Sequence, residues 1–422
     1  MLTTLKNREF RLLWLGQTVS HLGDQFHLIA LPWLVLALTG DPLQLGLVMA
    51  LAGIPRALVM LLGGAIADRI SPRLLMIGSD LLRFGIAAGI AAAVATGTVG
   101  LWMIYALALG FGLISGFFLP AAEATLPRVV GERQLAGGNS LMMIADQAAQ
   151  FVGPALAGSI IALLSHEVAG MPAGMAGIAF AFAVDAASFA FGVITLTLMR
   201  PVHGFGSERH PLRDIADGLH FVWRDATIRT LVIVIGLANL MLTGPVFVGL
   251  PVLAAERLPG GVAAFGAVLS GYAAGNLAGM AAAGSWRPSA RQLGWFGFAI
   301  FPFFAAIYTA IGFVTNTWVA VGLLVLAGIA NGILSINVIT LLQQMTPKPF
   351  LGRVMSVLML SMYGLGPISQ MVTGWVLHYS TTWLFCGAAI CLAIPAVVAL
   401  RHRSMWDFTP IEAAPTGAAS SL

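Results

Sequence analysis

The sequence predicts an all-α integral membrane protein with twelve transmembrane helices in two six-helix bundles related by pseudo-two-fold symmetry. Of its 422 residues, 59% are hydrophobic and only 9% are charged. The mean hydropathy of +0.91 lies far outside the range of soluble domains. Apolar runs of transmembrane length recur along the whole chain. Short motifs also repeat between its two halves, as in a parallel structural repeat.

Each apolar run is bounded by Gly, Pro or charged residues and is long enough to cross a bilayer. The runs lie at 12–37, 45–67, 74–95, 101–120, 139–164, 175–198, 230–253, 263–285, 293–312, 318–341, 352–377 and 382–400. We therefore expect an N-terminal bundle over 1–199, a linker over 200–229, a C-terminal bundle over 230–403 and a disordered tail over 404–422. Within the linker, Ile215, Leu219 and Val222 recur at near-helical spacing, which predicts an amphipathic surface helix.

The basic residues define an orientation. With these spans, 18 of the 21 Lys and Arg fall on one side, Arg257 alone falls on the other, and Arg56 and Arg83 lie inside spans. The positive-inside rule then predicts that both termini and the linker are cytoplasmic. The first apolar run is too long for a cleavable signal, so we expect it to remain as helix 1.

Several functional classes are disfavoured by the sequence. The basic residues are spread over short loops without a stripe that could follow phosphates, so no nucleic-acid partner is expected. Neither lysine follows a glycine-rich phosphate loop, which argues against ATP hydrolysis. His166-Glu167 lacks the second His of a zinc protease, because Gly170 stands at that position. We expect no enzyme activity, no metal and no cofactor, and we read Cys386 and Cys391 as apolar fillers.

Repeats and glycine spacing predict how the helices pack. Arg69-x-Ser-x-Arg73 is matched by Arg287-x-Ser-x-Arg291, and Gly153-Pro154 is matched by Gly366-Pro367, at offsets of 218 and 213 residues. Small residues four apart let helix backbones approach closely in lipid. Such pairs predict helix contacts at Gly85 and Gly89, at Gly112 and Gly116, and along Gly271, Gly275 and Gly279.

A charged turn separates the second and third apolar runs. Its pattern Gly-x-x-x-Asp-Arg-x-x-x-Arg, at Gly64, Asp68, Arg69 and Arg73, resembles the signature loop of the major facilitator superfamily of secondary transporters, although Ser71 and Pro72 depart from the usual pattern. The resemblance implies a conformational latch in which Asp68 contacts the start of helix 11 at its positive dipole end. The alternative is that these charges only set topology.

Helix 1 carries a polar stripe of Gln17, Ser20, His21 and Asp24, with His27 at its edge. Asp24 lies at the centre of the span, where an ionised carboxylate costs about 2.5 to 3.5 kcal/mol, so it should face a cavity or a partner. Arg56 is predicted at a similar depth in helix 2. Two interpretations stay open: Asp24 exchanges protons, with Arg56 tuning it and His21 as a relay, or Asp24 and Arg56 form a permanent ion pair.

Helix 5 presents Asp146 and Gln150 on one face, followed by Gly153-Pro154 and Gly158. This segment resembles the Gly-Pro-x-x-Gly-Gly motif of exporters in the superfamily, with Ala157 replacing one Gly. The motif implies a helix that bends where the bundles rock, while the alternative is an ordinary proline kink. Asp146 joins Asp24, Arg56 and His21 as a candidate proton-coupling residue.

Other polar residues in the spans divide into structural and ligand-binding candidates. We expect Asp185 in helix 6 to be packed, protonated or hydrogen-bonded rather than a proton carrier, and Asp80 and Arg83 to form a local pair. A cavity with few polar anchors suits bulky amphipathic ligands. The candidate residues for its wall are Gln17, Trp33, Gln147, Gln150, Asn239, Tyr272, Asn331, Asn337 and Tyr363.

Segments of helix 1, Leu15-Gly16-Gln17, Leu22-Gly23-Asp24 and Ala30-Leu31-Pro32-Trp33-Leu34-Val35, resemble the bacterial branch of the superfamily that includes macrolide and enterobactin exporters. The resemblance implies proton-coupled efflux of amphipathic drug-like compounds, with a role in antibiotic resistance, by a monomer in the bacterial inner membrane. Its partners would be lipids, a small amphipathic substrate and protons. The alternatives are export of an endogenous siderophore or lipid-like metabolite, import, or a non-transporting scaffold or sensor.

Overall fold

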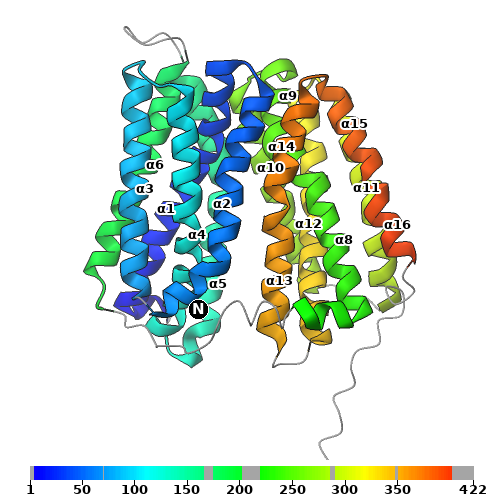
Figure 1. Cartoon of the computed structure of the whole chain (residues 1–422), viewed down its shortest axis with the longest axis horizontal. Coiled ribbons are helices and arrows are strands. Elements are labelled where there is room, and N and C mark those ends of the chain that lie inside the picture. The colour runs from blue at the N-terminus through cyan, green and yellow to red at the C-terminus, as the bar shows by residue number, and fades with distance from the viewer. Residues whose placement is uncertain are drawn as a thin grey trace, which may run out of the picture.

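The computed structural model describes residues 4–69, 71–165, 174–201, 219–285, 290–346 and 350–401. All regular structure in these ranges is helical, and the helices stand side by side in two groups (Figure 1). Ten helices in the described part of the chain are long and apolar enough to cross a membrane. The predicted all-helical membrane architecture is confirmed, while twelve spans stay a prediction.

The N-terminal helix group contains the elements up to residue 198. They are η1 (Thr4–Lys6), α1 (Arg8–Thr39), α2 (Pro42–Arg69), α3 (Pro72–Ala95), α4 (Leu101–Val129), α5 (Glu132–Leu163) and α6 (Met175–Leu198). The C-terminal helix group contains the elements from residue 226. They are α8 (Ala226–Gly244), η2 (Pro245–Gly249), α9 (Leu250–Arg257), α10 (Val262–Ser285), α11 (Ala290–Phe313), α12 (Thr317–Met345), α13 (Leu351–Gly364), α14 (Gly366–Leu377), α15 (Thr381–Cys391) and α16 (Ala393–Arg401).

Two predicted spans are absent from the ten for identifiable reasons. The helix α5 is 32 residues long, but Asp146, Gln147 and Gln150 near its centre lower its hydropathy. The predicted span at 352–377 is divided at Leu365 into α13 and α14, of 14 and 12 residues, because Pro367 cannot continue the hydrogen bonding of the preceding helix. Each piece alone is shorter than a bilayer crossing.

Side-chain caps fix several helix starts. The Asn7 side chain accepts hydrogen bonds from the backbone N–H groups of Glu9 and Phe10 at the start of α1. Asp225 and Asn316 do the same for α8 and α12. Gly40 ends α1 with φ of 62°, a left-handed conformation that glycine adopts without steric cost.

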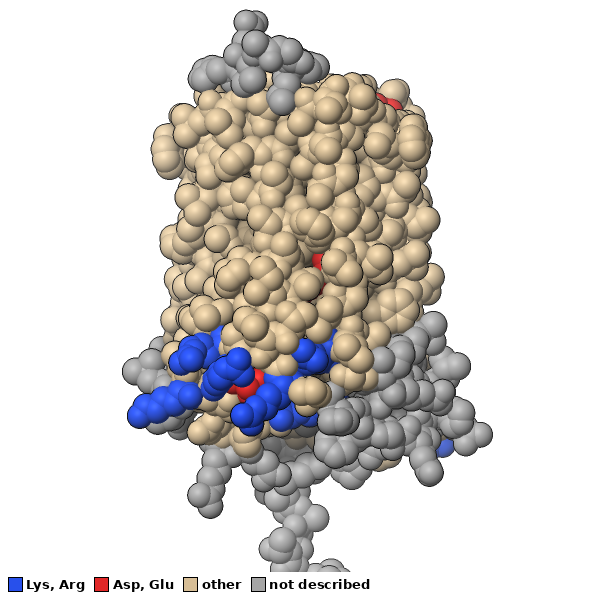
Figure 2. All heavy atoms as spheres, turned by 90° about the vertical axis from the view of Figure 1, so that its left-hand side faces the viewer, with Lys and Arg blue, Asp and Glu red and all other residues tan. Residues whose placement is uncertain are grey.

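The two ends of the molecule differ in charge. Basic side chains gather at the end where the N-terminus lies, here named the basic end (Figures 1 and 2). The other end, here named the far end, carries the turn at Gly40 and the turn between α9 and α10. Exposed Trp102, Trp318 and Trp383 lie in the far-end first turns of α4, α12 and α15, while exposed Trp223 and Trp295 lie towards the basic end. Such aromatic belts mark the two surfaces of a bilayer.

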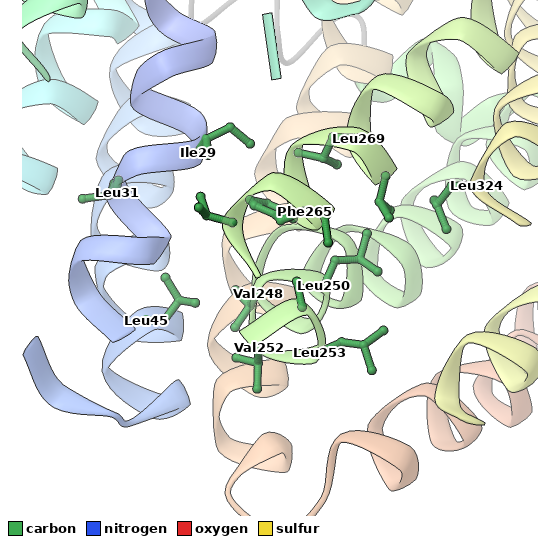
Figure 3. Packing of buried hydrophobic residues seen from close by; sticks show 14 of the residues in the cluster. Ile29, Leu31, Leu45, Val248, Leu250, Val252, Leu253, Phe265, Leu269 and Leu324 are labelled. Carbon is green, nitrogen blue, oxygen red and sulfur yellow. The ribbon is translucent and has the colours of Figure 1, made fainter. Parts of the chain in front are cut away.

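The largest buried apolar cluster joins the two helix groups. Figure 3 shows Ile29 of α1 and Leu45 of α2 beside Val248 of η2 and Phe265 of α10, and these side chains are at most 1% exposed. All four lie in the far-end half of their helices. The core therefore closes the molecule at the far end.

Glycine contacts test the predicted helix packing. Gly275 and Gly279 of α10 lie against the α12 backbone, and Gly112 of α4 lies against the α2 backbone, so these contacts are confirmed. A Cβ at Gly85 or Gly89 would have no heavy atom within 4 Å, so the contacts predicted there are wrong. Spacing of four residues alone does not show which helix face meets a neighbour.

The predicted linker and tail lie largely outside the described residues. Residues 219–224 are helical, and Val222 is fully buried against the C-terminal helix group. The remainder of the predicted amphipathic helix and the tail at 404–422 are not among the described ranges. The predicted domain boundaries stay a prediction.

Candidate functional site at the centre of the spans

Two carboxylates from different helices meet one imidazole at the middle of the molecule. The His21 Nδ1 atom lies 3.9 Å from an oxygen of Asp24 on α1 and 4.0 Å from an oxygen of Asp146 on α5. Gln150 donates a hydrogen bond of 2.8 Å to Asp146. We name His21, Asp24, Asp146 and Gln150 the midspan cluster. Asp24 and Asp146 are both close to the centres of their helices.

Local geometry explains how the cluster forms. His21 and Asp24 are three residues apart, so they share a face of α1. The helices α1 and α5 approach closely because the side chain of Gln25 occupies the space that a Cβ atom on residue 153 would need, and Gly153 has no Cβ. The side chains of His21, Asp24 and Asp146 are 32%, 36% and 40% exposed, so they border accessible space.

The cluster brings two acidic groups and one basic group together. Two carboxylates this close repel each other when both are ionised, and a protonated imidazole between them relieves the repulsion. The cluster therefore links α1 and α5 through polar side chains.

Arg56 was predicted to act on Asp24. Its side chain is exposed on α2, and its backbone packs against Gly116 of α4. Whether it forms a permanent pair with Asp24 or tunes its protonation stays a prediction. The described contacts instead bring Asp146 within reach of His21, 125 residues away in the chain.

The predicted cavity residues of the N-terminal helix group lie in different surroundings. Gln17 is only 4% exposed, Gln147 and Gln150 are half-buried beside Asp146, and Trp33 packs against Gly261 near the far end. The structure therefore brings Gln150 to the midspan cluster, leaves Gln147 half-buried on the same helix, and places Gln17 inside its helix group and Trp33 between the groups.

Four of the five predicted cavity residues of the C-terminal helix group are half-buried: Asn239, Tyr272, Asn331 and Asn337. The amides of Asn239 and Asn337 donate to carbonyls of their own helices, at Ile235 and Ile333. The Tyr272 hydroxyl is hydrogen-bonded to Asn276, and Asn331 is half-buried on α12. The side chain of Tyr363 lies outside the described residues.

A cavity of about 300 Å³ lies between α11 and α12. Its wall is entirely apolar and consists of Phe296, Ala299, Ile300, Phe303, Leu326, Ile329, Ala330 and Ile333. None of the predicted cavity residues lines it. Without a polar anchor, it has the character of a crevice for hydrocarbon rather than of a selective ligand site.

The predicted latch is described only at Arg73. Gly64, Asp68 and Arg69 belong to α2, but their side chains lie outside the described residues. The Arg73 guanidinium donates to the carbonyls of Leu196 and Thr197, at 2.7 and 2.9 Å, at the last turn of α6. A cation at a helix C-terminus satisfies free carbonyls and complements the helix dipole.

The helix-5 motif lies at a contact between the two helix groups. Gly158 of α5 packs against Gly266 of α10, since a Cβ at Gly158 would lie 2.6 Å from the Val262 carbonyl oxygen and 3.2 Å from the Gly266 Cα. The Pro154 carbonyl faces Gly266, and the Ala155 N–H donates to the Ser270 hydroxyl at 2.9 Å. The motif is therefore part of the surface that holds the groups together at the far end.

A second glycine pair joins the groups between α2 and α14. A Cβ at Gly46 would lie 2.7 Å from the Gln370 carbonyl oxygen and 3.0 Å from the Gly374 Cα. Gly53 of α2 meets the ring of Pro367 lower on the same helices. We name the pairs Gly158–Gly266 and Gly46–Gly374 the crossing glycines. Any side chain at these positions would force the backbones apart.

Two buried ionic contacts lie inside the N-terminal helix group. Arg83 donates to Asp80 at 2.6 Å on α3, which confirms the predicted local pair. Asp185 of α6 lies 3.1 Å from the Nδ1 atom of His27, which confirms that this carboxyl group is packed and hydrogen-bonded. The sequence indicated that His27 lies at the edge of the polar stripe of helix 1. It could not indicate its partner, because Asp185 is 158 residues away in the chain.

Comparisons with known proteins agree on a family. A family model described as Major Facilitator Superfamily matches residues 13–371. The chain is 28% identical over 413 residues to the uncharacterized MFS-type transporter y4rN of Sinorhizobium fredii, covering 94% of this chain and 95% of that protein. It is 27% identical over 244 residues to the multidrug efflux pump Tap of Mycolicibacterium fortuitum, covering 55% of this chain and 56% of the pump.

A more distant relative and a solved structure extend the comparison. The chain is 23% identical over 375 residues to the enterobactin exporter EntS of Escherichia coli, covering 82% of this chain and 79% of the exporter. A bacterial homologue of the iron transporter ferroportin, in an inward-facing state, superposes with a TM-score of 0.70 at 17% identity, covering 93% of this chain and 98% of that one. The chain therefore belongs to the Major Facilitator Superfamily and is a multi-pass membrane transporter, not an enzyme.

Proposed function

We propose that the protein is a proton-coupled exporter of amphipathic, drug-like compounds. The observation that carries the proposal is the midspan cluster, in which His21 lies within 4.0 Å of both Asp24 and Asp146. A carboxylate–imidazole–carboxylate arrangement at membrane depth is suited to binding and releasing protons. The similarity to the multidrug efflux pump Tap favours the outward direction and an amphipathic substrate.

In this proposal α5 and the α13–α14 pair complete twelve spans. The N-terminal bundle then covers 1–199 and the C-terminal bundle 230–403, joined by the linker at 200–229. The crossing glycines support the pseudo-two-fold relation, because Gly46 corresponds to Gly266 at an offset of 220 residues and Gly158 corresponds to Gly374 at an offset of 216. These offsets are close to those of the repeated sequence motifs.

The proposed orientation puts the basic end in the cytoplasm of a bacterial cell. The gathering of Lys and Arg at that end supports this arrangement through the positive-inside rule (Figure 2). Both termini would then be cytoplasmic, and the protein would lie in the inner membrane as a monomer. The crossing glycines close the outer side, which corresponds to an inward-facing state.

The transport cycle follows from differential binding to two states. Substrate and protons compete for the space around the midspan cluster, so protonation of Asp24 and Asp146 favours release of substrate to the outside. Opening the outer side requires the crossing glycines to separate. The latch at Gly64, Asp68, Arg69 and Arg73 would hold the cytoplasmic side closed in that state. The proton gradient is the energy source, and no cofactor is required.

Substrate contacts are assigned mainly to the C-terminal bundle. Asn239, Tyr272, Asn331 and Asn337 supply amides and a hydroxyl among apolar side chains. Few polar anchors in apolar surroundings favour bulky ligands with one or two polar groups. Tyr363 on α13 and the glutamines beside Asp146 would complete this wall.

Proteoliposomes with a defined pH gradient test the proposal. Purified protein is reconstituted, and movement of a lipophilic cation and of a macrolide is followed with the inside acidic, with no gradient, and with a protonophore. We expect accumulation only with the inside acidic, together with proton release measured by an enclosed pH dye. Transport that is unchanged by the protonophore would reject proton coupling.

A second candidate function is export of a catecholate siderophore. The similarity to EntS favours it, because the match extends over 82% of this chain. Adding enterobactin outside the same inside-acidic vesicles distinguishes the candidates, since an exporter of an endogenous metabolite should accumulate this compound and not lipophilic cations. Proton coupling through the midspan cluster is common to both.

A further inference from the structure

We propose that His27 and Asp185 form a second proton-binding site, separate from the midspan cluster and buried between α1 and α6. His27 Nδ1 and Asp185 Oδ2 are 3.1 Å apart. The Asp185 side chain is fully buried, and its Oδ1 atom makes no hydrogen bond with a described residue. The inference deepens the proposed proton-coupled export, on which it rests.

Charge balance inside the N-terminal helix group supports the site. Asp80 and Arg83, which are 0% and 4% exposed, neutralise each other at 2.6 Å. Asp185 then needs one positive charge or one proton, and His27 is its contacting partner. One proton shared by the two side chains makes the site neutral, whether as imidazolium and carboxylate or as imidazole and carboxylic acid. Loss of that proton leaves an uncompensated charge in an apolar interior, which is costly.

The surroundings keep this site away from water. The His27 ring stacks on Phe111 of α4 at 4.5 Å and meets Phe182 of α6 edge-on at 5.5 Å. The α1 and α6 backbones are tightly packed, because the Cβ position of Gly23 is filled by the Ser188 side chain. The fully buried Asp185 side chain cannot reach solvent without separating these helices. His27 retains 20% exposure, so the imidazole is the side from which a proton can enter.

The charged groups around the pair connect it to the midspan cluster. Asp185 is the sole charged residue of α6, and Asp24 and Arg83 are both near enough to act on it. In the middle of the packed spans, the titratable or charged residues are His21, Asp24 and His27 on α1, Asp80 and Arg83 on α3, and Asp146 on α5, while α4 contributes the rings of Phe111 and Phe118. The other Asp, Glu, Lys and Arg residues of these helices, such as Arg73, Glu123 and Arg128, lie towards the basic end.

The position of Asp24 near the buried pair determines how protonation of one site affects proton binding at the other. An ionised Asp24 attracts a proton to the buried pair, and a protonated Asp24 weakens that attraction. Protonation of the midspan cluster therefore favours release of the proton held by His27 and Asp185. The buried pair would store one proton in one state of the cycle and release it in the other.

Infrared difference spectroscopy of the reconstituted protein tests the site directly. Spectra are recorded between about pH 8 and about pH 5 for the wild type, Asp185→Asn and Ser188→Ala. Ser188→Ala is the matched control, because this residue is one turn away on α6 and carries no charge. We expect a pH-dependent carboxylic-acid or imidazolium band, equivalent to one proton per chain, that is lost in Asp185→Asn and kept in Ser188→Ala.

Two further variants make the test decisive. In Asp24→Asn the band should remain, with its midpoint at lower pH, because the neighbouring negative charge is gone. If Asp185→Asn cannot be purified, His27→Gln replaces it and should also lose the pH-dependent band, since the remaining acid keeps its proton. Identical pH-dependent spectra for the wild type and the pair variants would reject the site and leave a static hydrogen bond.

The spectra and the transport assay fail independently. A band assigned to the pair in a protein that moves no substrate would reject the proposed function and keep the proton site. Proton-driven export by a protein whose His27–Asp185 pair gives no pH-dependent band would reject the proton site and keep the proposed function.

Discussion

The two helix groups resemble each other in geometry and differ in charge. Each contributes one helix to each glycine crossing, and each carries a Gly-Pro step at a crossing. Yet Asp24, Asp80, Arg83, Asp146 and Asp185 all lie in spans of the N-terminal group, while residues 258–285 and 292–345 of the other group contain no Asp, Glu, Lys or Arg. The comparison supports a division that we propose: the shared glycine crossings serve the conformational change, proton binding belongs to the N-terminal group, and most substrate contacts belong to the C-terminal group.

The largest effect is expected at the midspan cluster. Asp24→Asn removes one carboxylate while keeping the size of the side chain, so export driven by a pH gradient should fall to the level of empty vesicles. Substrate binding, measured by tryptophan fluorescence, should persist and depend less on pH, because one of the two carboxylates at which protons compete with substrate is gone. Proton-driven counterflow that continues unchanged in Asp24→Asn would reject Asp24 as a proton-coupling residue, and with it the proposed division between the two groups.

A glycine crossing should give the next largest effect. Gly158→Val places a side chain where the Val262 carbonyl oxygen lies within 2.6 Å of the Cβ position. Overpacking of about 1–3 kcal/mol would disfavour the closed outer side about 5- to 150-fold. Thiol labelling of a cysteine introduced near the far end should rise, and export should slow.

The matched control for this variant is Gly89→Ala on α3. No heavy atom lies within 4 Å of the added Cβ, and alanine is the better helix former, so labelling and transport should be unchanged. An equal response of Gly158→Val and Gly89→Ala would show that the crossing is not a gate.

A smaller effect is expected at Arg73. Arg73→Ala frees the Leu196 and Thr197 carbonyls at the end of α6, so the free energy of unfolding should fall by about 1 kcal/mol. Thermal unfolding followed by tryptophan fluorescence measures this change. If Arg73 acts only as a cap, transport at a permissive temperature stays near the wild-type rate, whereas a loss of transport with unchanged stability would favour its role in the latch.

The smallest effect is expected from the amides of the C-terminal group. Asn337→Ala removes one hydrogen-bonding group worth about 1 kcal/mol, so the apparent affinity for a polar-tipped substrate should change about fivefold, with little change for a purely apolar one. Comparing KM values for the two kinds of compound measures this. A change in proton stoichiometry in Asn337→Ala would instead show that Asn337 takes part in proton coupling. Proton binding would then not be confined to the N-terminal group.

Sequence predicted the helices well because apolar runs and charged turns are local signals. It did not predict where α13 gives way to α14, because a Gly-Pro step can either bend a helix or divide it. The candidate proton residues were predicted from charge at mid-span, but their partners were not. His21 meets Asp146 and His27 meets Asp185 across more than a hundred residues, and only helix packing determines such contacts.

The tryptophans at both surfaces restrict how the two groups can move. Trp102 belongs to the N-terminal group, Trp318 and Trp383 belong to the C-terminal group, and all three are more than 70% exposed near the far end. Sliding one group along the membrane normal past the other would carry indole rings out of the headgroup layer, either into water or into hydrocarbon. Tilting about the bilayer centre leaves every ring near its own depth. The exposed tryptophans therefore favour tilting of the two helix groups over translation of one group along the membrane normal.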